Sequence, residues 1–283
     1  MNDKLKINLS GARFNNFKSV FDDLEKCLKE VGIDFYVLGA LARDMLFSNE
    51  EINTRATADV DLAVYINTKD QDIYQLLRNK LIDNYDFVES KENNFALTST
   101  DGTIIDLLPF GEIEVEDGVT IMGEGLSSIK VNGFKEVHLN GLNEVDSEEL
   151  GSFKVAKLSS IILLKLIAFD DRPEMRENDP SDVSSIIANY FDINANDIYE
   201  YHNDLFEGDE IELEFIAAQV IGREMKIIIH ENNELYERAN SIIESHILKA
   251  EKSRFIIGMI GDFCSEIDTA ILWLKKILEG IKE

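Results

Sequence analysis

The sequence predicts an α/β (α+β) fold, with a mixed sheet and helices followed by an all-helical C-terminal region. Strand-like and helical patterns alternate over about the first 150 residues, and short β-like runs fill the Gly-rich end of this part, residues 109–150. From Phe153 to Lys282 the apolar residues recur almost throughout at helical spacing. The chain has 283 residues, which is long for one small domain. We therefore expect two domains, residues 1–150 and residues 151–283.

Periodicity and turn residues predict the elements of the first domain. A helix over residues 15–31 ends at Gly32, because glycine is the residue that most often stops a helix. Asp101-Gly102 supplies a tight turn between two strands. The elements expected after the first helix are a strand over 35–38, a helix over 41–47, a polar loop over 48–58, a strand over 59–66, a helix over 71–84, strands over 87–90, 95–98 and 103–108, and a β-like run over 136–139.

The second domain is expected to be built from helices. Apolar side chains recur at helical spacing over residues 153–169, 181–190, 211–230, 233–249 and 266–280. The single tryptophan, Trp273, belongs to an apolar stripe with Leu274 and Ile277, which indicates core packing.

Cysteine use and hydropathy predict a cytoplasmic protein without a membrane segment. Cys27 and Cys264 lie far apart in the sequence and are expected to be buried free thiols in a reducing compartment. The N-terminus carries no apolar leader run. The longest apolar-rich stretch, residues 161–168, is too short to cross a bilayer.

The net charge limits the nucleic-acid partners that the chain can bind. Lys and Arg number 28 against 55 Asp and Glu, which gives a formal charge of −27 spread over both halves of the chain. Such a field repels phosphate backbones, so we expect no tight duplex-DNA binding. A small nucleic-acid partner with local basic contacts is compatible with this charge.

Three features carry candidate chemistry. Gly39-Ala40 lies between a predicted strand and a predicted helix. Asp59 and Asp61 lie on the next strand, where residues i and i+2 point to the same face. Asp106 lies on a later strand among apolar neighbours, where an unpaired carboxylate is costly.

These residues indicate a divalent cation and a triphosphate. Two adjacent carboxylates repel each other, and Mg²⁺ removes that cost while keeping coordination sites for water and phosphate. A third carboxylate lets the cluster hold two ions about 3.5–4 Å apart, which stabilise the attacking and leaving oxygens of a phosphoryl displacement. A glycine turn that opens a helix lets triphosphate oxygens approach the backbone. The ordinary alternatives are solvated strand charges for Asp59 and Asp61 and a structural salt bridge for Asp106.

The same motifs resemble those of the DNA polymerase β-like nucleotidyltransferase superfamily and, within it, the AbiEii-like predicted bacterial nucleotidyltransferases. Residues 37–44, Val-Leu-Gly-Ala-Leu-Ala-Arg-Asp, resemble the Gly-Ala-x-Ala-Arg-Asp turn of that group. Residues 55–62 resemble its Arg-x-Thr-x-Asp-x-Asp segment, and residues 105–111 resemble its third-carboxylate strand.

The resemblance continues into the helical part and covers residues 33–191 in total. Residues 164–172 resemble a Leu-Lys-Leu-Ala helix that ends in Asp-Arg. Asp179 and Asp182 match a Lys-Asp-x-x-Asp element in which Asn178 replaces the lysine. Ala40 stands where the superfamily usually has Gly or Ser.

The resemblance implies an Mg²⁺-dependent nucleotidyltransferase, with Mn²⁺ as an alternative ion. Such an enzyme moves a nucleoside monophosphate from an NTP to an acceptor hydroxyl and releases pyrophosphate. Asp59, Asp61 and Asp106 are the implied catalytic and metal-binding residues. The implied nucleotide-binding residues are Gly39, Ala40, Arg43 and Lys165, with Lys165 closing on the triphosphate across a cleft between the domains. RNA and protein are candidate acceptors, and family members include toxins of toxin–antitoxin pairs, so a partner protein is a further expectation.

Several roles remain open at this point. Arg43 either contacts the triphosphate or pairs with Asp44, and Arg55 either contacts substrate or orients Asp59. Asp179 and Asp182 either cap a helix or orient Lys165.

Two rival functions also remain open. The first is a nucleotide-binding module that has lost turnover, which Ala40 and Asn178 favour. The second is an antitoxin-like interaction protein whose acidic surface blocks a basic partner.

Overall fold

The computed structural model describes residues 4–10, 14, 17–50, 52, 59–91, 93–122, 126–207 and 212–283. The chain divides into two compact units. The first consists of Met1–His138 and Leu142–Ala156, and the second of Leu139–Gly141 and Lys157–Glu283. The predicted fold class is confirmed, because a mixed sheet with helices is followed by a helical C-terminal region.

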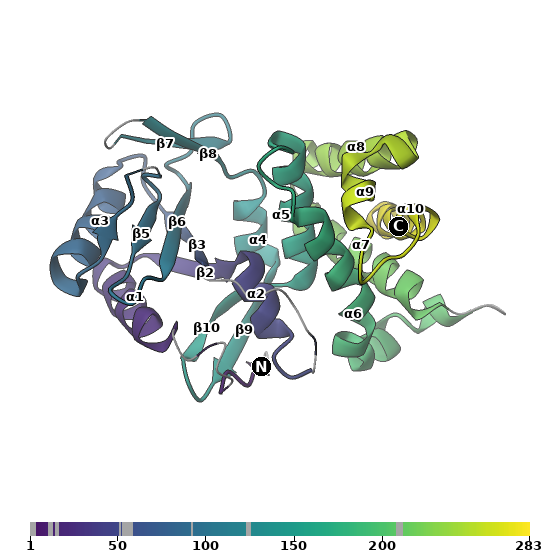
Figure 1. The fold of residues 1–283 in the computed structure, drawn as a ribbon, viewed down its shortest axis with the longest axis horizontal. Coiled ribbons are helices and arrows are strands. Elements are labelled where there is room, and N and C mark those ends of the chain that lie inside the picture. Colours follow the sequence, from purple (N-terminus) through teal and green to yellow (C-terminus); the bar gives the residue numbers. More distant parts are fainter. Residues whose placement is uncertain are drawn as a thin grey trace. The chain divides into compact units, whose positions relative to one another are not determined.

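The described part of the first unit contains an eight-stranded mixed sheet (Figure 1). Near its middle, β3 is parallel to β6 on one side and antiparallel to β2 on the other. In spatial order the strands are β1 (Leu5–Lys6), β9 (Leu142–Ser147), β10 (Gly151–Ala156), β2 (Asp34–Leu38), β3 (Asp59–Ile66), β6 (Ile104–Gly111), β5 (Ala96–Thr98) and β4 (Val88–Glu89). A separate antiparallel hairpin consists of β7 (Gly118–Met122) and β8 (Leu126–Lys130).

Two helices of the first unit pack against each other and against the sheet. The Cys27 thiol of α1 (Phe17–Val31) donates to the Leu77 carbonyl of α3 (Asp72–Tyr85). The Tyr74 hydroxyl of α3 donates to the Leu107 carbonyl of β6 at 2.9 Å. Burial raises the pKa of the Cys27 thiol to about 11, so this group stays protonated at neutral pH. Cys27 and Cys264 are both free and buried, as the sequence predicted.

The central strand β3 is apolar along most of its length. Val60, Leu62, Val64 and Ile66 are at most 1% exposed, and Ala63 between them is also fully buried. A continuous apolar run is typical of a strand covered on both faces. The two carboxylates of β3 lie at its beginning, on either side of the buried Val60.

The structure corrects two sequence predictions near residue 150. Residues 136–139 belong to a helix, α4 (Phe134–Asn140), and not to a β-like run, because the buried side chains Phe134 and Val137 are three residues apart. Residues 153–156 belong to strand β10, which a tight connection joins to β9, and the expected helix begins only at Leu158.

The second unit is helical in its described part. Its helices are α5 (Leu158–Asp171), α6 (Asp179–Tyr201), α7 (Leu213–Ile229), α8 (Asn233–Lys249), α9 (Arg254–Met259) and α10 (Ile267–Lys282), with short 3-10 turns at Asn203–Phe206 and Ala250–Lys252. Trp273 is completely buried, which confirms its predicted core role. Across the described residues, no helix is long and apolar enough to cross a membrane.

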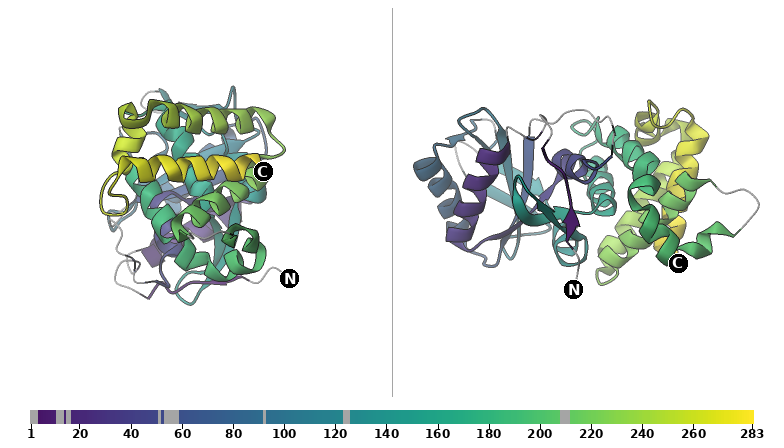
Figure 2. Two further views of the ribbon diagram at one scale, coloured as in Figure 1. Left: turned by 90° about the vertical axis from the view of Figure 1, so that its right-hand side faces the viewer. Right: turned by 90° about the horizontal axis from the view of Figure 1, so that it is seen from below.

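Two glycines set the contact between α7 and α10, which cross one another in the second unit (Figure 2). A Cβ placed on Gly222 would lie closer than 3.0 Å to the Ile277 carbonyl oxygen. A Cβ placed on Gly280 would lie equally close to the Gln219 carbonyl oxygen. The helix backbones approach directly, so each glycine is required by space at the crossing.

We expect Gly222→Ala and Gly280→Ala each to lower the free energy of unfolding by about 1–3 kcal/mol, because overpacking outweighs the gain in helix propensity. Gly261→Ala, in the loop between α9 and α10, is the control for the added methyl group, since a Cβ there meets nothing within 4 Å. Urea titration measures all three variants. Equal stability of Gly222→Ala and Gly261→Ala would contradict this description of the crossing.

A neutral histidine is buried in the helical unit. His246 of α8 is 7% exposed, stacks on Phe255 with ring centroids 4.9 Å apart and meets Phe169 edge-on at 6.0 Å. Its Nδ1 lies 3.0 Å from Ser253 Oγ. Burial, with a smaller effect of Lys249, lowers the pKa of His246 to about 4.

Between pH 6.5 and about 4 the unfolded chain binds a proton at His246 that the folded chain does not, so stability falls as the pH falls through this window. The free energy of unfolding falls by about 3 kcal/mol across this window, at 1.36 kcal/mol per pKa unit. The measurement is urea unfolding of wild type and His246→Phe at pH 7 and pH 4. The wild type is expected to lose more stability than the variant, and parallel losses would show that His246 is not the group responsible.

Candidate active site

The sheet brings two of the predicted carboxylates into register. Asp61 of β3 and Asp106 of β6 are direct Cα partners in the parallel pairing, and Asp59 is the partner of Ile104. Neighbouring strands lie about 4.8 Å apart, and paired residues present their side chains to the same face. Asp59 shares that face with Asp61, since they are two residues apart. All three predicted carboxylates thus belong to one face of the sheet, with Asp59 exposed and the other two half-buried.

The glycine turn lies beside the same carboxylates. Leu38, the last residue of β2, is the antiparallel partner of Asp61, so the chain that continues into α2 (Gly39–Leu46) leaves the sheet next to Asp61. Gly39 has a φ of +71°, which glycine adopts readily. A Cβ at Gly39 would lie closer than 3.0 Å to Asp61 Oδ2. The Asp61 carboxylate therefore occupies the space that any other residue at position 39 would need.

The first turn of α2 has the features of an anion site. Its N-cap residue is Leu38, whose apolar side chain makes no capping hydrogen bond. The first backbone N–H groups of a helix have no partner within the helix, and they favour negative charge. Gly39 and Ala40 are both half-buried, so part of this turn faces solvent.

Arg43 pairs with its neighbour, as one of the two open interpretations proposed. Its Nε and Nη2 donate to Asp44 Oδ1 at 3.0 and 2.8 Å, and Arg43 is 2% exposed. Both residues belong to α2, one turn after Gly39, and both are buried. The contact of Arg43 with a triphosphate stays a prediction.

Asp106 has a support that the sequence did not reveal. The side-chain Nδ2 of Asn93 donates to Asp106 Oδ1 at 3.2 Å. Asn93 lies in the turn between β4 and β5, 13 residues before Asp106, among ordinary turn residues. No local sequence pattern marks this contact, which results from the pairing of Ala96 with Asp106 across the β5–β6 hairpin.

Lys165 is held by two aspartates within the helical unit. Its Nζ donates to Asp179 Oδ1 at 2.6 Å and to Asp182 Oδ2 at 2.7 Å. The side chains of all three residues are at most 12% exposed. This is the orienting contact that the sequence left as an alternative to helix capping. The proposed phosphate contact of Lys165 stays a prediction, and Arg55 lies outside the described residues.

The carboxylate oxygens of Asp61 and Asp106 suit a magnesium ion whose remaining ligands come from the substrate. Across the described residues, no group of three or more His, Cys, Asp or Glu side chains is arranged to hold a metal ion by itself. Mg²⁺ usually keeps several waters and is bound by one or two carboxylates with substrate phosphates. Asp61 and Asp106 match that kind of site, because they are half-buried oxygen donors in register beside the open turn at Gly39. The residues present therefore fit an ion completed by a bound triphosphate.

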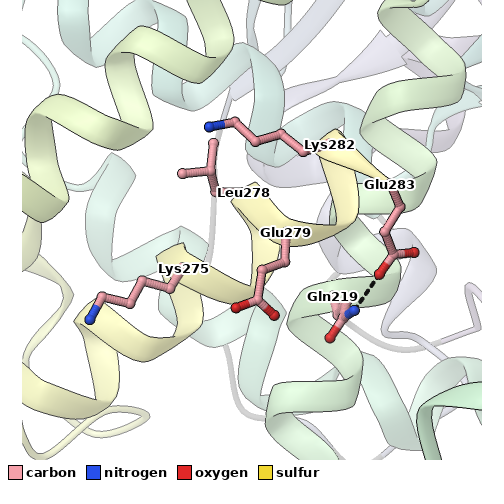
Figure 3. Close-up of a pocket in the computed structure, with 6 residues that line it drawn as sticks. All are labelled: Gln219, Lys275, Leu278, Glu279, Lys282 and Glu283. Atoms are coloured by element: carbon pink, nitrogen blue, oxygen red, sulfur yellow. Dashed lines mark hydrogen bonds between the residues drawn. The ribbon is translucent and has the colours of Figure 1, made fainter.

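A hollow of about 550 Å³ on the helical unit has a different character (Figure 3). Three of its four charged side chains, Glu279, Lys282 and Glu283, form ion pairs with residues of the same unit. Glu279 accepts from Lys276 at 2.6 Å, Lys282 donates to Glu244 at 2.6 Å, and Gln219 donates to Glu283. None of the predicted site residues lines it. We interpret this hollow as a surface charge network and not as a reaction site.

Comparisons with known proteins returned distant structural likenesses. No family model and no curated protein matches the chain. Among solved structures, an antigenic nucleotidyltransferase-like protein from Paracoccidioides brasiliensis is 16% identical, with a TM-score of 0.38 over 66% of this chain and 89% of that chain. The antibiotic-resistance factor ANT(2'')-Ia is 11% identical, with a TM-score of 0.36 over 82% of this chain and 100% of that chain. A CCA-adding enzyme is 12% identical, with a TM-score of 0.31 over 91% of this chain and 67% of that chain. Likenesses at this level assign neither a family nor an activity, so we rest the function on the residues of this chain.

Gly39→Ala is expected to disturb the site as well as the fold. A left-handed alanine alone costs about 1–2 kcal/mol, and at position 39 the new Cβ also displaces Asp61 or α2. Gly32→Ala is the matched control, because Gly32 has a similar φ of +76° and a Cβ there meets nothing within 4 Å. We expect Gly39→Ala to be the less stable variant in urea titrations and the only one of the two that weakens Mn²⁺ binding in the presence of an ATP analogue. Equal behaviour of the two alanine variants would refute the close approach of Gly39 and Asp61.

Proposed function

We propose that the protein is an Mg²⁺- or Mn²⁺-dependent nucleotidyltransferase that moves a nucleoside monophosphate from an NTP to an acceptor hydroxyl and releases pyrophosphate. The observation that carries this proposal is the contact between the Gly39 turn and Asp61, which is itself in register with Asp106. A phosphate-binding turn and a pair of metal-binding carboxylates are the two parts that such a reaction needs in one place.

The turn holds the triphosphate. The backbone N–H groups at the start of α2, from Gly39 and Ala40 onward, donate to phosphate oxygens. Because Gly39 has no side chain, the Asp61 carboxylate lies directly against the backbone at the start of α2, so a phosphate bound at these N–H groups lies beside it. This fixes the reacting phosphorus beside the carboxylates of β3 and β6.

The carboxylates hold the ions and the proton. Asp59, Asp61 and Asp106 would supply oxygen ligands to the ions, which when bound would lower the pKa of the acceptor hydroxyl and neutralise charge on the phosphates. Asp106 accepts the proton of the acceptor hydroxyl while the hydroxyl oxygen forms a bond to the α-phosphorus. The bond from that phosphorus to the bridging oxygen breaks, and the electron pair leaves with pyrophosphate.

The remaining predicted residues act around this centre. Arg43, one turn after Gly39 on α2 and paired with Asp44, is the proposed side-chain contact for the triphosphate. Lys165, which donates to Asp179 and Asp182, is the further cation proposed for the triphosphate.

The acceptor and the partners belong to the same proposal. An RNA end, a protein hydroxyl or a small molecule is a suitable acceptor, and a partner protein of a toxin–antitoxin pair is compatible with the acidic surface. The charge of −27 disfavours tight duplex-DNA binding.

The test is incubation with four labelled NTPs, Mg²⁺ and total cellular RNA or protein, followed by a search for transferred label. EDTA is expected to abolish transfer and added Mg²⁺ or Mn²⁺ to restore it. We expect Asp61→Asn to reduce transfer at least about 100-fold, since it removes a ligand at the reacting phosphate.

Asp34→Asn removes the same charge from the opposite end of the sheet, where Asp34 is the partner of Tyr65, and is expected to keep transfer. NTP binding that depends on metal but gives no pyrophosphate would instead favour a module that has lost turnover.

A further inference from the structure

Asn93 has a fixed orientation in the turn before β5. Its side-chain Oδ1 accepts the backbone N–H of Phe95 at 3.0 Å. Its own backbone N–H donates to Ser90 Oγ at 3.2 Å, and its carbonyl accepts the N–H of Ala96 at 3.0 Å. A side-chain oxygen bonded two residues ahead is an Asx turn, which holds both the backbone and the amide plane.

This orientation decides which atom of Asn93 faces Asp106. The oxygen must face Phe95, because a backbone N–H needs an acceptor, and so the NH₂ group faces the carboxylate. If the amide were reversed, its NH₂ group would face the Phe95 N–H and its oxygen would face the Asp106 carboxylate. Two donors would then meet at Phe95 and two acceptors at Asp106. Phe95 is 1% exposed and its carbonyl accepts the Leu107 N–H of β6 at 2.9 Å, so the turn is tied to the strand that carries Asp106.

We propose that Asn93 is the positioning residue for Asp106: its amide holds one carboxylate oxygen and so sets the direction in which Asp106 presents itself to the metal and the acceptor. This role rests on the proposed nucleotidyltransferase function. Partners that orient a metal ligand without touching the metal are worth about 10–100-fold in metal affinity or activity. Asn93 has the geometry of such a partner, because it contacts Asp106 through a donor that its own turn has locked.

The neighbouring asparagine offers a matched control. Asn94 lies in the same turn, and its contacts go to the β7–β8 hairpin, with its N–H donating to Ser127 Oγ at 3.2 Å and its Nδ2 to the Ile121 carbonyl at 3.5 Å. Replacement of either residue by serine removes one amide. Only Asn93→Ser removes the donor to Asp106, and serine at position 93 can still accept from Phe95 in a weaker turn of the same kind.

The experiment measures Mn²⁺ binding by electron paramagnetic resonance in the presence of an ATP analogue with a non-hydrolysable α,β bridge. We expect Asn93→Ser to weaken Mn²⁺ binding about 10-fold and Asn94→Ser to leave it unchanged. In an Asp106→Asn background the effect of Asn93→Ser is expected to vanish, because a residue that acts only through Asp106 has nothing left to position. In transfer assays Asn93→Ser lowers kcat by a similar factor and leaves the KM for NTP within about twofold.

A second variant covers the case in which Asn93→Ser does not fold, as thermal melting would show. Asn93→Asp keeps the acceptor for Phe95 and sets a carboxylate against Asp106, so it is expected to fold and to lose kcat.

The possible outcomes separate the two proposals. Equal effects of Asn93→Ser and Asn94→Ser, or an undiminished effect in the Asp106→Asn background, overturn the positioning role and leave the function standing. Failure of the wild type to bind Mn²⁺ with the ATP analogue overturns the proposed function itself, and the role of Asn93 falls with it.

Discussion

The close approach of the Gly39 backbone to the Asp61 carboxylate is the constraint on which the candidate site depends. It arises because β2 and β3 are antiparallel, so the end of one strand lies beside the beginning of the other. The parallel pairing of β3 with β6 then sets Asp106 next to Asp61. Two pairings of opposite sense thus bring together a helix N-terminus and carboxylates from two strands, which are far apart in sequence.

The two ends of the sheet use their carboxylates differently. Asp34, at the far end of β2, accepts from Lys154 at 2.7 Å and lies 2.9 Å from His138 Nε2. The His138 bond, with a further contribution from Lys154, holds the pKa of Asp34 well below its usual range. Through these two contacts, Asp34 of β2 is linked to His138 of α4 and to Lys154 of β10. At the other end of β2, Asp61 lies against the backbone of Gly39, and Asp106 accepts a hydrogen bond from the Asn93 amide. This arrangement of two carboxylates is suited to an added cation and its phosphates.

Much of the fold could be predicted from the sequence, since strong periodicity determined the elements. Strand β3 was predicted with its observed bounds because an apolar run preceded by two aspartates has a clear start. Helix α4 was missed because its few residues give too short a window to separate period 3.6 from period 2. Strand β10 was read as helix because Phe153, Val155 and Ala156 continue an apolar pattern into α5, and only the pairing with β9 distinguishes them.

The site was predictable to the extent that it depends on local pattern. Gly39 is visible in the sequence as a glycine between a predicted strand and a predicted helix, and Asp59, Asp61 and Asp106 are visible as carboxylates on apolar strands.

The contact of Asn93 with Asp106 was hidden, since it depends on the register of a hairpin and the direction of one amide. The pairing of Arg43 with Asp44 was one of two open interpretations, and the distance of 2.8 Å between Arg43 Nη2 and Asp44 Oδ1 shows that the ion pair is present.

The central claim is that Asp61, Asp106 and the first turn of α2 together hold an ion and a triphosphate. X-ray diffraction at the manganese absorption edge, from crystals grown with Mn²⁺ and an ATP analogue with a non-hydrolysable α,β bridge, tests this claim most directly. The account predicts an anomalous peak about 2 Å from carboxylate oxygens of both Asp61 and Asp106, with triphosphate oxygens at the backbone N–H groups that begin at Gly39. A manganese ion bound away from these two residues, or a triphosphate that does not reach α2, would contradict it.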